Sequence, residues 1–249
     1  MVISMEDKIF KTEHKVRFED IDLTGKLTVP ATVVLAQEAA TLHGEMWGAG
    51  YDDLRRENSA WVLVRAKYSF YEMPSFGEKF TVETWVNPCR HALYPRFYRF
   101  CDESGKVFME GGSIWSIYNF AQNKAMNPGG KAFEFPAVVL ENQPDSPRPV
   151  RAGEEENSLV RRVLYSDADG NGHLNNCKYI NWAVDILPVD FWGKNSIKTL
   201  EISYHAQAPL DKNLTLNYTF RGSEMTINGK LEDTVVFAAK LTFDKEIEK

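Results

Sequence analysis

Apolar residues recur along the chain with two spacings, and the two spacings alternate in a fixed order. Four apolar residues in the first half follow one another at helical intervals: Leu35, Ala39, Leu42 and Met46. Four in the second half do the same: Tyr179, Trp182, Ala183 and Ile186. This spacing predicts two helices, each with one buried stripe.

Segments in which every second residue is apolar follow each predicted helix. In the first half these positions are Phe80, Val82, Thr84 and Val86, and in the second half they are Leu214, Leu216, Tyr218 and Phe220. Such alternation predicts strands buried on one face. Turn residues at 102–105 and 222–224 separate the strands, and the pair Asn228-Gly229 predicts a tight hairpin.

A short motif precedes each predicted helix. The pattern DxDxxGxL occupies 20–27 and returns at 167–174, an offset of 147 residues. Motif, helix and strands therefore recur in the same order, which indicates two copies of one structural unit. Residues 127–158 are rich in proline, from Pro128 onward, and contain an acidic run at 154–156. We interpret them as a linker and place the boundary near residue 145.

A helix packed on an antiparallel sheet buries the apolar face of both elements. Used twice, this arrangement predicts an α+β chain with a tandem (double) hot-dog fold, each repeat a long helix on a curved antiparallel sheet. A chain of 249 residues is long enough for two such domains, at 1–145 and 146–249. Chance similarity between two unrelated α+β halves is disfavoured, because helix and strand order recur together with the motif.

Composition limits the functional class. No run approaches the roughly 18 consecutive apolar residues of a membrane span, and segment 1–15 carries charges where a signal peptide needs apolar residues. We therefore expect a cytoplasmic protein. The formal net charge of −6 argues against nucleic-acid binding. The cysteines, Cys89, Cys101 and Cys177, form no CxxC pair, so neither a disulfide framework nor a metal site is expected.

Polar side chains gather in the second copy of the motif. They stand at alternate positions: Asp167, Asp169, Asn171 and His173. In an extended chain this spacing would point all four toward one face. Asn175 or Asn176 is a natural N-cap for a helix that begins near Cys177. The unpaired N–H groups at that helix start could hold a polarised carbonyl oxygen.

Two other interpretations of this segment compete with that one. The segment 167–172 matches the opening of a calcium-binding EF-hand loop, but Lys178 occupies the position that should supply a bidentate Glu. Cys177 could be a nucleophile near a helix N-terminus, although core packing is commoner for such a cysteine. In the first copy, Lys26 stands where the second copy has His173. This difference indicates that the second copy has the functional side chains.

With these residues in view, the sequence resembles the acyl-ACP thioesterase family, plant and bacterial, of the hot-dog superfamily. Residues 169–182 follow that family's DxNxHxNNxxYxxW pattern without a gap. The segments 61–65 (WVLVR) and 83–85 (ETW) look like parts of the family's N-terminal repeat. The resemblance covers nearly the whole chain.

The resemblance implies a thioester hydrolase of fatty acid biosynthesis that releases a free fatty acid from acyl carrier protein (ACP), with no cofactor and no metal. It implies a catalytic second repeat that uses Asp169, Asn171 and His173. The first repeat would be non-catalytic and would accommodate the acyl chain, with Phe70 and Phe80 as candidate lining residues.

The family's further acidic residue falls at Gln207 in this chain. A glutamine can orient a water or a carbonyl but cannot accept a proton, so the duty of general base would fall on Asp169. His205, two residues from Gln207 and expected on the same strand face, is an alternative. The residue patterns do not decide whether Asp169 is a nucleophile or a base.

ACP is acidic, so a net-negative enzyme should meet it with local cations. The candidate cations are Arg151, Arg161, Arg162, Lys178 and Lys194. The candidate substrate-binding residues are Asn175, Asn176, Arg161, Arg162 and Lys178. An acyl-CoA thioesterase, a hot-dog dehydratase and a non-catalytic acyl-thioester-binding protein are alternative functions, because fold does not fix function. The sequence also leaves a homodimer open.

Overall fold

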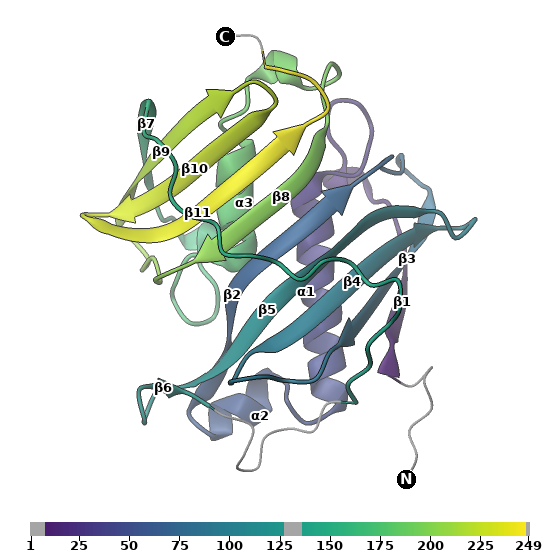
Figure 1. Cartoon of the computed structure of the whole chain (residues 1–249), viewed down its shortest axis with the longest axis vertical. Helices are drawn as coiled ribbons and strands as arrows, with labels where there is room; N and C mark the ends of the chain where they lie inside the picture. The colour runs from purple at the N-terminus through teal and green to yellow at the C-terminus, as the bar shows by residue number, and fades with distance from the viewer. Residues whose placement is uncertain (1–7, 127–135, 248–249) are drawn as a thin grey trace. The chain divides into compact units, whose positions relative to one another are not determined.

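The computed structural model describes residues 8–126 and 136–247, so segment 1–7 and Pro128 of the predicted linker lie outside the described residues (Figure 1). The chain divides into two compact units. The first comprises Met1–Val64 with Tyr71–Pro147, and the second comprises Arg65–Phe70 with Arg148–Lys249. The predicted boundary at residue 145 lies beside the point where the chain passes from the first unit to the second.

The first unit is an antiparallel sheet with one long helix. Its helices are α1 (Val29–Met46) and α2 (Tyr51–Arg56), with a 3-10 turn, η2 (Phe18–Asp20), before α1. Its strands are β1 (Phe10–Lys15), β2 (Ser59–Phe70), β3 (Lys79–Val86), β4 (Tyr94–Asp102), β5 (Val107–Asn119) and β6 (Lys124–Ala125). The order in the sheet is β1-β3-β4-β5-β2, β6 pairs with β5, and α1 contacts β3 and β1.

The second unit repeats this element order. Its helices are η3 (Tyr165–Asp167), α3 (Asn176–Val184) and η4 (Val189–Phe191), and its strands are β7 (Asn157–Arg162), β8 (Ile197–Tyr204), β9 (Asn213–Arg221), β10 (Glu224–Leu231) and β11 (Thr234–Phe243). The order β7-β9-β10-β11-β8 is that of the first unit, and residues 65–69 of β2 continue it beside β8. The predicted antiparallel α+β architecture is confirmed.

Both long helices begin at a side-chain cap. The Thr28 hydroxyl accepts the N–H of Ala31 (3.2 Å), and Gly48, at φ +66°, follows the end of α1 in the left-handed conformation that suits glycine. The predicted stripe of α1 is right at Ala39 and wrong at its large residues, since Met46 is 63% exposed and the two leucines are only half-buried. The buried face of α1 consists mainly of small residues, with Val29, Thr32, Val33, Ala36, Ala39, His43 and Gly44.

The predicted stripe of α3 is largely confirmed. Tyr179, Trp182 and Ala183 are buried, while Ile186 lies beyond the end of the helix and is half-buried. Tyr179 packs edge-on against Phe237 of β11, with the ring centroids 4.9 Å apart. The buried face of α3 therefore contains large aromatic residues, whereas the buried face of α1 consists mainly of small ones.

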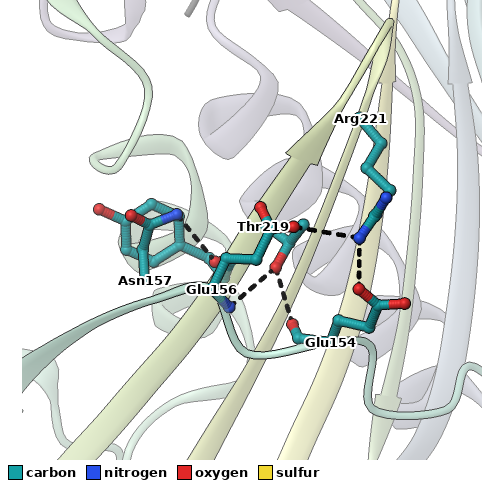
Figure 2. Close-up of polar contacts among 6 residues, drawn as sticks. Glu154, Glu156, Asn157, Thr219 and Arg221 are labelled. Atoms are coloured by element: carbon teal, nitrogen blue, oxygen red, sulfur yellow. Dashed lines mark hydrogen bonds and ion pairs between the residues drawn. The ribbon is translucent and has the colours of Figure 1, made fainter.

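The predicted alternation is confirmed on β3, in the first half of the chain. On β9, in the second half, only two of the four predicted positions are buried. The alternating positions of β3 are all buried, as predicted. On β9 the pattern shifts, because Asn217 and Thr219 are buried while Tyr218 and Phe220 are only half-buried. The connecting segment covers the other face there: the Thr219 hydroxyl donates to the Glu154 carbonyl (2.8 Å) (Figure 2). Residues 136–156 contain no helix or strand, which agrees with a linker.

The predicted hairpin at Asn228-Gly229 is wrong, because both residues lie inside β10. A Cβ at Gly229 would lie 2.3 Å from Cε1 of Phe237, so glycine is needed for close packing rather than for a turn. The chain turns after β10 at Glu232, which has φ +55°. The turns at 102–105 and 222–224 are confirmed, with Gly105 and Gly222 at positive φ.

Among the helices of residues 8–126 and 136–247, none combines the length and apolar character needed to cross a membrane.

Candidate functional site

The second DxDxxGxL loop is a closed turn. The Asp169 N–H donates to the His173 carbonyl (2.8 Å), and the Gly172 N–H donates to the Asp169 carbonyl (3.0 Å). The Asp169 Oδ1 accepts the N–H groups of Asn171 (2.9 Å) and His173 (3.4 Å). Gly172 has φ +76°, a conformation that costs other residues energy. The loop is therefore held by the Asp169 carboxylate and closed by a glycine.

This geometry overturns the expectation of an extended segment with four polar side chains on one face. Asp167 is buried, and its Oδ2 accepts the N–H of Leu164 (3.1 Å), which fixes the turn before the loop. Asn171 is exposed, while Asp169 and His173 are half-buried. Asp167 is thus a structural residue, and the chemically available side chains are the other three.

The first copy of the motif has the same hydrogen bonds. The Asp22 Oδ1 accepts the N–H groups of Thr24 (2.8 Å) and Lys26 (3.4 Å), the Asp22 N–H donates to the Lys26 carbonyl (2.9 Å), and Gly25 has φ +75°. Threonine and lysine occupy the positions of Asn171 and His173 without changing the loop. The fold of the loop therefore does not require an asparagine or a histidine there.

A second segment lies alongside the loop. The Leu174 N–H donates to the Ala208 carbonyl (2.8 Å), and the Leu210 N–H donates to the Gly172 carbonyl (3.0 Å). These bonds bring the loop next to 208–210, and Gln207 directly precedes that segment. The sequence did not predict this pairing. The first unit has the same pairing, since the Leu27 N–H donates to the Pro74 carbonyl (2.9 Å).

Gln207 and His205 precede this second segment and are both exposed. The expectation that they share a strand face is wrong, because β8 ends at Tyr204. The N–H groups of His205 and Ala206 both donate to the Val236 carbonyl, at 2.8 and 3.1 Å, so the backbone bends there. The Gln207 side chain makes no hydrogen bond to any residue that the structure describes.

The start of α3 lies next to the loop. Asn175 is its N-cap, as predicted, and its Oδ1 accepts the Cys177 N–H (2.8 Å). Asn176 is the first helical residue, and its carbonyl accepts the Tyr204 hydroxyl (2.9 Å). The Asn175 side chain is therefore committed to the helix, while the positive end of the helix dipole lies beside the loop.

Cys177 is unsuited to be a nucleophile. It is 4% exposed, and burial raises the pKa of its thiol to about 12. A thiolate is the reactive form of cysteine, so this thiol is inert at neutral pH. The core-packing interpretation of Cys177 agrees with its position.

The His173 ring and the Asp169 carboxylate each keep an unused polar atom. His173 Nδ1 is buried and has no hydrogen-bond partner among the described residues. Asp169 Oδ2 is likewise without a hydrogen bond to the described part of the chain, since both backbone bonds go to Oδ1. An imidazole and a carboxylate in adjoining turns, each with a free atom, can bind or transfer a proton.

The predicted cations differ in their availability. Arg161 forms an ion pair with Asp185 (2.7 Å), and Arg162 is paired with Asp211, Nε to Oδ1 at 2.8 Å. Lys178 is half-buried and forms no ion pair with the residues that the structure describes. Arg161 and Arg162 would have to exchange a carboxylate to bind a partner, whereas Lys178 would not.

The two remaining predicted cations are exposed. Lys194 lies 3.4 Å from the carboxylate of Asp190, and Arg151 forms no ion pair within the described ranges. Across 8–126 and 136–247, no group of three or more His, Cys, Asp or Glu side chains is placed to hold a metal ion.

Sequence comparisons connect the chain with one family. The family model of the acyl-ACP thioesterase N-terminal domain matches residues 7–127, and that of the acyl-ACP thioesterase C-terminal domain matches residues 150–248. The chloroplastic palmitoyl-acyl carrier protein thioesterase of Arabidopsis thaliana is 22% identical over 84% of this chain and 54% of its own length. The chloroplastic dodecanoyl-[acyl-carrier-protein] hydrolase of Cinnamomum camphora is 22% identical over 86% of this chain and 60% of its own length. The chain thus spans little more than half the length of these curated relatives.

Solved structures agree over the whole chain. An acyl-ACP thioesterase from Bacteroides thetaiotaomicron has a TM-score of 0.87 at 26% identity, covering 97% of this chain and 100% of that chain. The 12:0-ACP thioesterase from Umbellularia californica shares the fold, with a TM-score of 0.81 at 18% identity, covering 96% and 97%. With both family domains matched in order, this chain belongs to the acyl-ACP thioesterase family.

Proposed function

We propose that the protein is an acyl-ACP thioesterase that hydrolyses fatty acyl-ACP to a free fatty acid and ACP in fatty acid biosynthesis. The observation that supports this most directly is the pair of matching loops. Both loops share the aspartate and its hydrogen bonds, yet only the second has the family's Asn171 and His173 beside Asp169. The loop does not need Asn171 or His173 for its shape, so these two side chains are available for chemistry.

The proposal includes a tandem hot-dog fold with divided labour. The repeated element order supports a hot-dog in each half: each unit has a helix, α1 of 18 residues or α3 of 9, and the same antiparallel order of five strands. The N-terminal repeat, 1–145, would accommodate the acyl chain and be non-catalytic. The C-terminal repeat, 146–249, would be catalytic, because its loop has the imidazole and the amide that the first loop lacks.

The proposed reaction uses water and breaks the thioester C–S bond. In one route Asp169 attacks the thioester carbon, the carrier thiolate leaves, and water hydrolyses the resulting acyl anhydride and protonates the thiolate; in the other, Asp169 accepts a proton from the attacking water and passes it to the leaving thiolate. The carrier leaves as its thiol, and the water oxygen becomes part of the carboxyl group. Asn171 and His173 hold the substrate and the developing oxyanion, together with the N–H groups at the start of α3. Gln207 orients the water or the carbonyl.

In this proposal the protein binds ACP through its local cations. ACP is acidic, so Lys178 and Arg151 meet it first, and Arg161 and Arg162 exchange their intramolecular carboxylates for those of the carrier. Asn176 contributes its backbone N–H at the substrate carbonyl, and Asn175, whose own N–H donates to the Asp167 carbonyl (2.9 Å), positions that N–H as the N-cap of α3. A cytoplasmic location and a homodimer remain predictions; the two curated relatives described above are chloroplastic by name.

A non-catalytic acyl-thioester-binding protein is the second candidate. One observation favours it: Gln207 stands where the resemblance implies an acidic residue, and its amide cannot accept a proton. An acyl-CoA thioesterase is distinguished only by its carrier, because the loop residues face the thioester in either case.

Thiol release from acyl-ACP and acyl-CoA substrates of varied chain length tests these proposals. Asp169→Asn keeps an oxygen for the N–H groups of Asn171 and His173 but removes the negative charge, so turnover should fall by at least about 100-fold with the fold intact. Asp22→Asn is the matched control, because it makes the same change in the same turn of the first unit. Full turnover in Asp169→Asn would refute the assignment.

Gln207→Glu separates the two candidate functions. If the wild type binds acyl-ACP and releases no thiol, and Gln207→Glu then releases thiol, the protein is a binding protein that has lost its acid. Turnover by the wild type that disappears in Asp169→Asn supports the thioesterase. Preference for ACP over CoA at equal chain length decides the carrier.

A further inference from the structure

The first unit contains a buried arginine with no acidic partner. Arg96 lies on β4 and is 5% exposed. Its Nη1 donates to Nδ1 of His43 (3.0 Å) on α1 and to the hydroxyl of Thr84 (3.2 Å) on β3. No carboxylate among the described residues forms an ion pair with it. Removing a guanidinium from water without a counter-charge is strongly unfavourable.

Neither partner neutralises the guanidinium. Burial and the neighbouring Arg96 charge lower the pKa of His43 to about 3, so the ring is neutral at ordinary pH and accepts at Nδ1. The Thr84 hydroxyl donates its own proton to the Phe97 carbonyl (2.9 Å), which leaves it as an acceptor for Arg96. An arginine side chain stays protonated even when burial lowers its pKa. Among the described residues, His43 and Thr84 are therefore the only hydrogen-bond acceptors of the Arg96 guanidinium, and both are neutral.

Arg96 lines a small cavity within the first unit. The cavity has a volume of about 60 Å³, and its other lining residues are Ala40, Thr41, Trp61, Val86, Tyr94 and Trp115. Because a single water molecule needs about 10–15 Å³ of such space, this cavity holds a group of a few heavy atoms rather than a whole ligand. Its walls are mostly apolar and aromatic, and its one formal charge comes from Arg96.

The guanidinium retains hydrogen-bonding capacity. Arginine has five N–H groups, and the two on Nη1 are used by His43 and Thr84. Those on Nε and Nη2 have no hydrogen-bond partner among the described residues. N–H groups on Nε and Nη2 point the same way and bind oxygen acceptors side by side. The cavity thus combines apolar walls with an unsatisfied cationic donor pair.

We propose that this cavity binds the far end of an acyl chain when that end bears an oxygen, as a hydroxyl or a carboxylate. The inference rests on the proposed function, in which the first unit accommodates the acyl chain. An oxygen acceptor completes the hydrogen bonds of Arg96, and the aromatic walls contact the methylene groups before it. A methyl end leaves the donors buried without a partner, which a site built for a polar group rejects strongly.

Substrates matched in length test the inference in the wild-type protein. Acyl-ACPs of equal heavy-atom count ending in a methyl, a hydroxyl or a carboxylate are compared at each chain length. We expect kcat/KM at the best length to be at least about tenfold higher for an oxygen-bearing end. Comparing hydroxyl with carboxylate then identifies which oxygen the site takes. Equal rates for all three ends, or a preference for methyl, would overturn the inference.

Arg96→Met removes the donors while keeping a long side chain, and it should abolish the preference, chiefly through KM. Arg99→Met is the matched control on the same strand. Arg99 donates to the Asn142 carbonyl (2.6 Å) and lies over the Trp85 ring, outside the residues that line the cavity. Its variant should keep the preference. A different result would overturn the inference: the wild type shows no preference for an oxygen-bearing end, and Arg96→Met accepts longer methyl-ended chains. Arg96 would then limit the chain length by its bulk alone.

Binding of uncleavable analogues keeps the test independent of catalysis and of variant folding. Calorimetry compares S-alkyl-CoA thioethers of one chain length that end in a methyl, a hydroxyl or a carboxylate, so that only the far end differs. Tighter binding of the oxygen-bearing analogues, in a protein that releases no thiol from acyl-ACP or acyl-CoA, would support the cavity and refute the thioesterase. Turnover of methyl-ended substrates with no difference in binding would support the thioesterase and refute the cavity.

Discussion

At the scale of single residues, burial decides which chemically able side chains can act. Cys177 stands four residues after His173, in the first turn of a helix, which is a position that can lower a thiol pKa. Burial acts in the opposite direction and raises it to about 12. His173 and Asp169 stay half-buried in the adjoining loop and keep unused polar atoms. Proximity along the sequence therefore does not make Cys177 part of the site.

Replacing Cys177 by alanine tests this distinction. We expect Cys177→Ala to retain thioester turnover within about twofold, because a thiol with so high a pKa makes no thiolate at neutral pH. In the wild type, iodoacetamide should modify the half-buried Cys89 and Cys101 before Cys177. Peptide mapping after timed labelling measures the order. Loss of turnover that follows the labelling of Cys177 would contradict the prediction.

His43 should make stability depend on pH. Its pKa is lowered from 6.5 to about 3 in the folded protein, so between these values the unfolded chain binds a proton that the folded chain does not. The free energy of unfolding should therefore fall as pH falls through this window, by at most about 1.4 kcal/mol per pH unit. Urea unfolding at pH 6.5, 5.8 and 5.0 (about the range in which few carboxylates titrate) measures the slope.

The control compares two histidine variants. His43→Gln keeps an acceptor for Arg96 but cannot titrate, so its slope should be shallower than that of the wild type. His205→Gln changes an exposed histidine and should keep the wild-type slope. Identical slopes in the wild type and His43→Gln would show that His43 does not contribute to the pH dependence of stability.

The sequence predicted the residues of the loop but not those of the buried network. Asp169 and His173 were found because the motif recurs with altered side chains. Arg96 and His43 have no such marker, since they are 53 positions apart and meet only when α1 packs near β4. The available signal was a charged residue among aromatic ones, in Tyr94-Pro-Arg96-Phe97-Tyr98, where a strand pattern expects burial.

At the scale of elements, the wrong predictions came from side-chain size more than from the spacing of apolar residues. The predicted stripe of α1 joined Ala39 to the large residues Leu35, Leu42 and Met46, yet Ala39 is buried together with Ala36 and the large residues are not. Both sets of residues have helical spacing, and only the packing of α1 against β1 and β3 selects the set with small side chains. Asn228-Gly229 failed for a related reason, because Gly229 makes room for the Phe237 ring in mid-strand. The sequence does not distinguish a glycine that makes room for a neighbouring side chain from a glycine that a turn requires.

The connecting segment is fastened to β9 and β10 by buried and exposed contacts of different strength (Figure 2). The buried Thr219 hydroxyl accepts the Glu156 N–H (3.2 Å) and donates to the Glu154 carbonyl (2.8 Å). Arg221 forms exposed ion pairs with Glu154 and Glu156. A buried polar group that loses its partner costs more than an exposed ion pair, so the hydroxyl should dominate.

Two variants measure this difference. Thr219→Val keeps the shape of the side chain and leaves two backbone groups without their partner, so the free energy of unfolding should fall by about 1–3 kcal/mol. Arg221→Met removes only the exposed ion pairs and should cost less than about 1 kcal/mol, with the loss reduced further by salt. Chemical denaturation at low and high ionic strength checks both. A larger loss from Arg221→Met would reverse the ranking.

At the scale of the whole molecule, the repeat predicted two units but not the exact division of the chain between them. The predicted boundary near 145 follows the linker, as a sequence pattern must. In the structure, Arg65–Phe70 of β2 belong with the second unit, where residues 65–69 pair antiparallel with β8. This pairing depends on strand order in space, and nothing in the alternation of β2 distinguishes its two ends. A strand that spans both units makes the linker an incomplete boundary.

The second unit should therefore depend on residues that lie far before the linker. A fragment comprising 148–249 lacks 65–70, and its β8 edge would expose unpaired N–H and C=O groups, which promote aggregation. We expect this fragment to aggregate on size-exclusion chromatography, and a synthetic peptide of 63–72 to restore a monomer with a near-UV circular dichroism signal. A scrambled peptide of the same composition should have no effect. If the fragment is monomeric and cooperatively folded without any peptide, the edge of β8 needs no partner and the linker is a sufficient boundary.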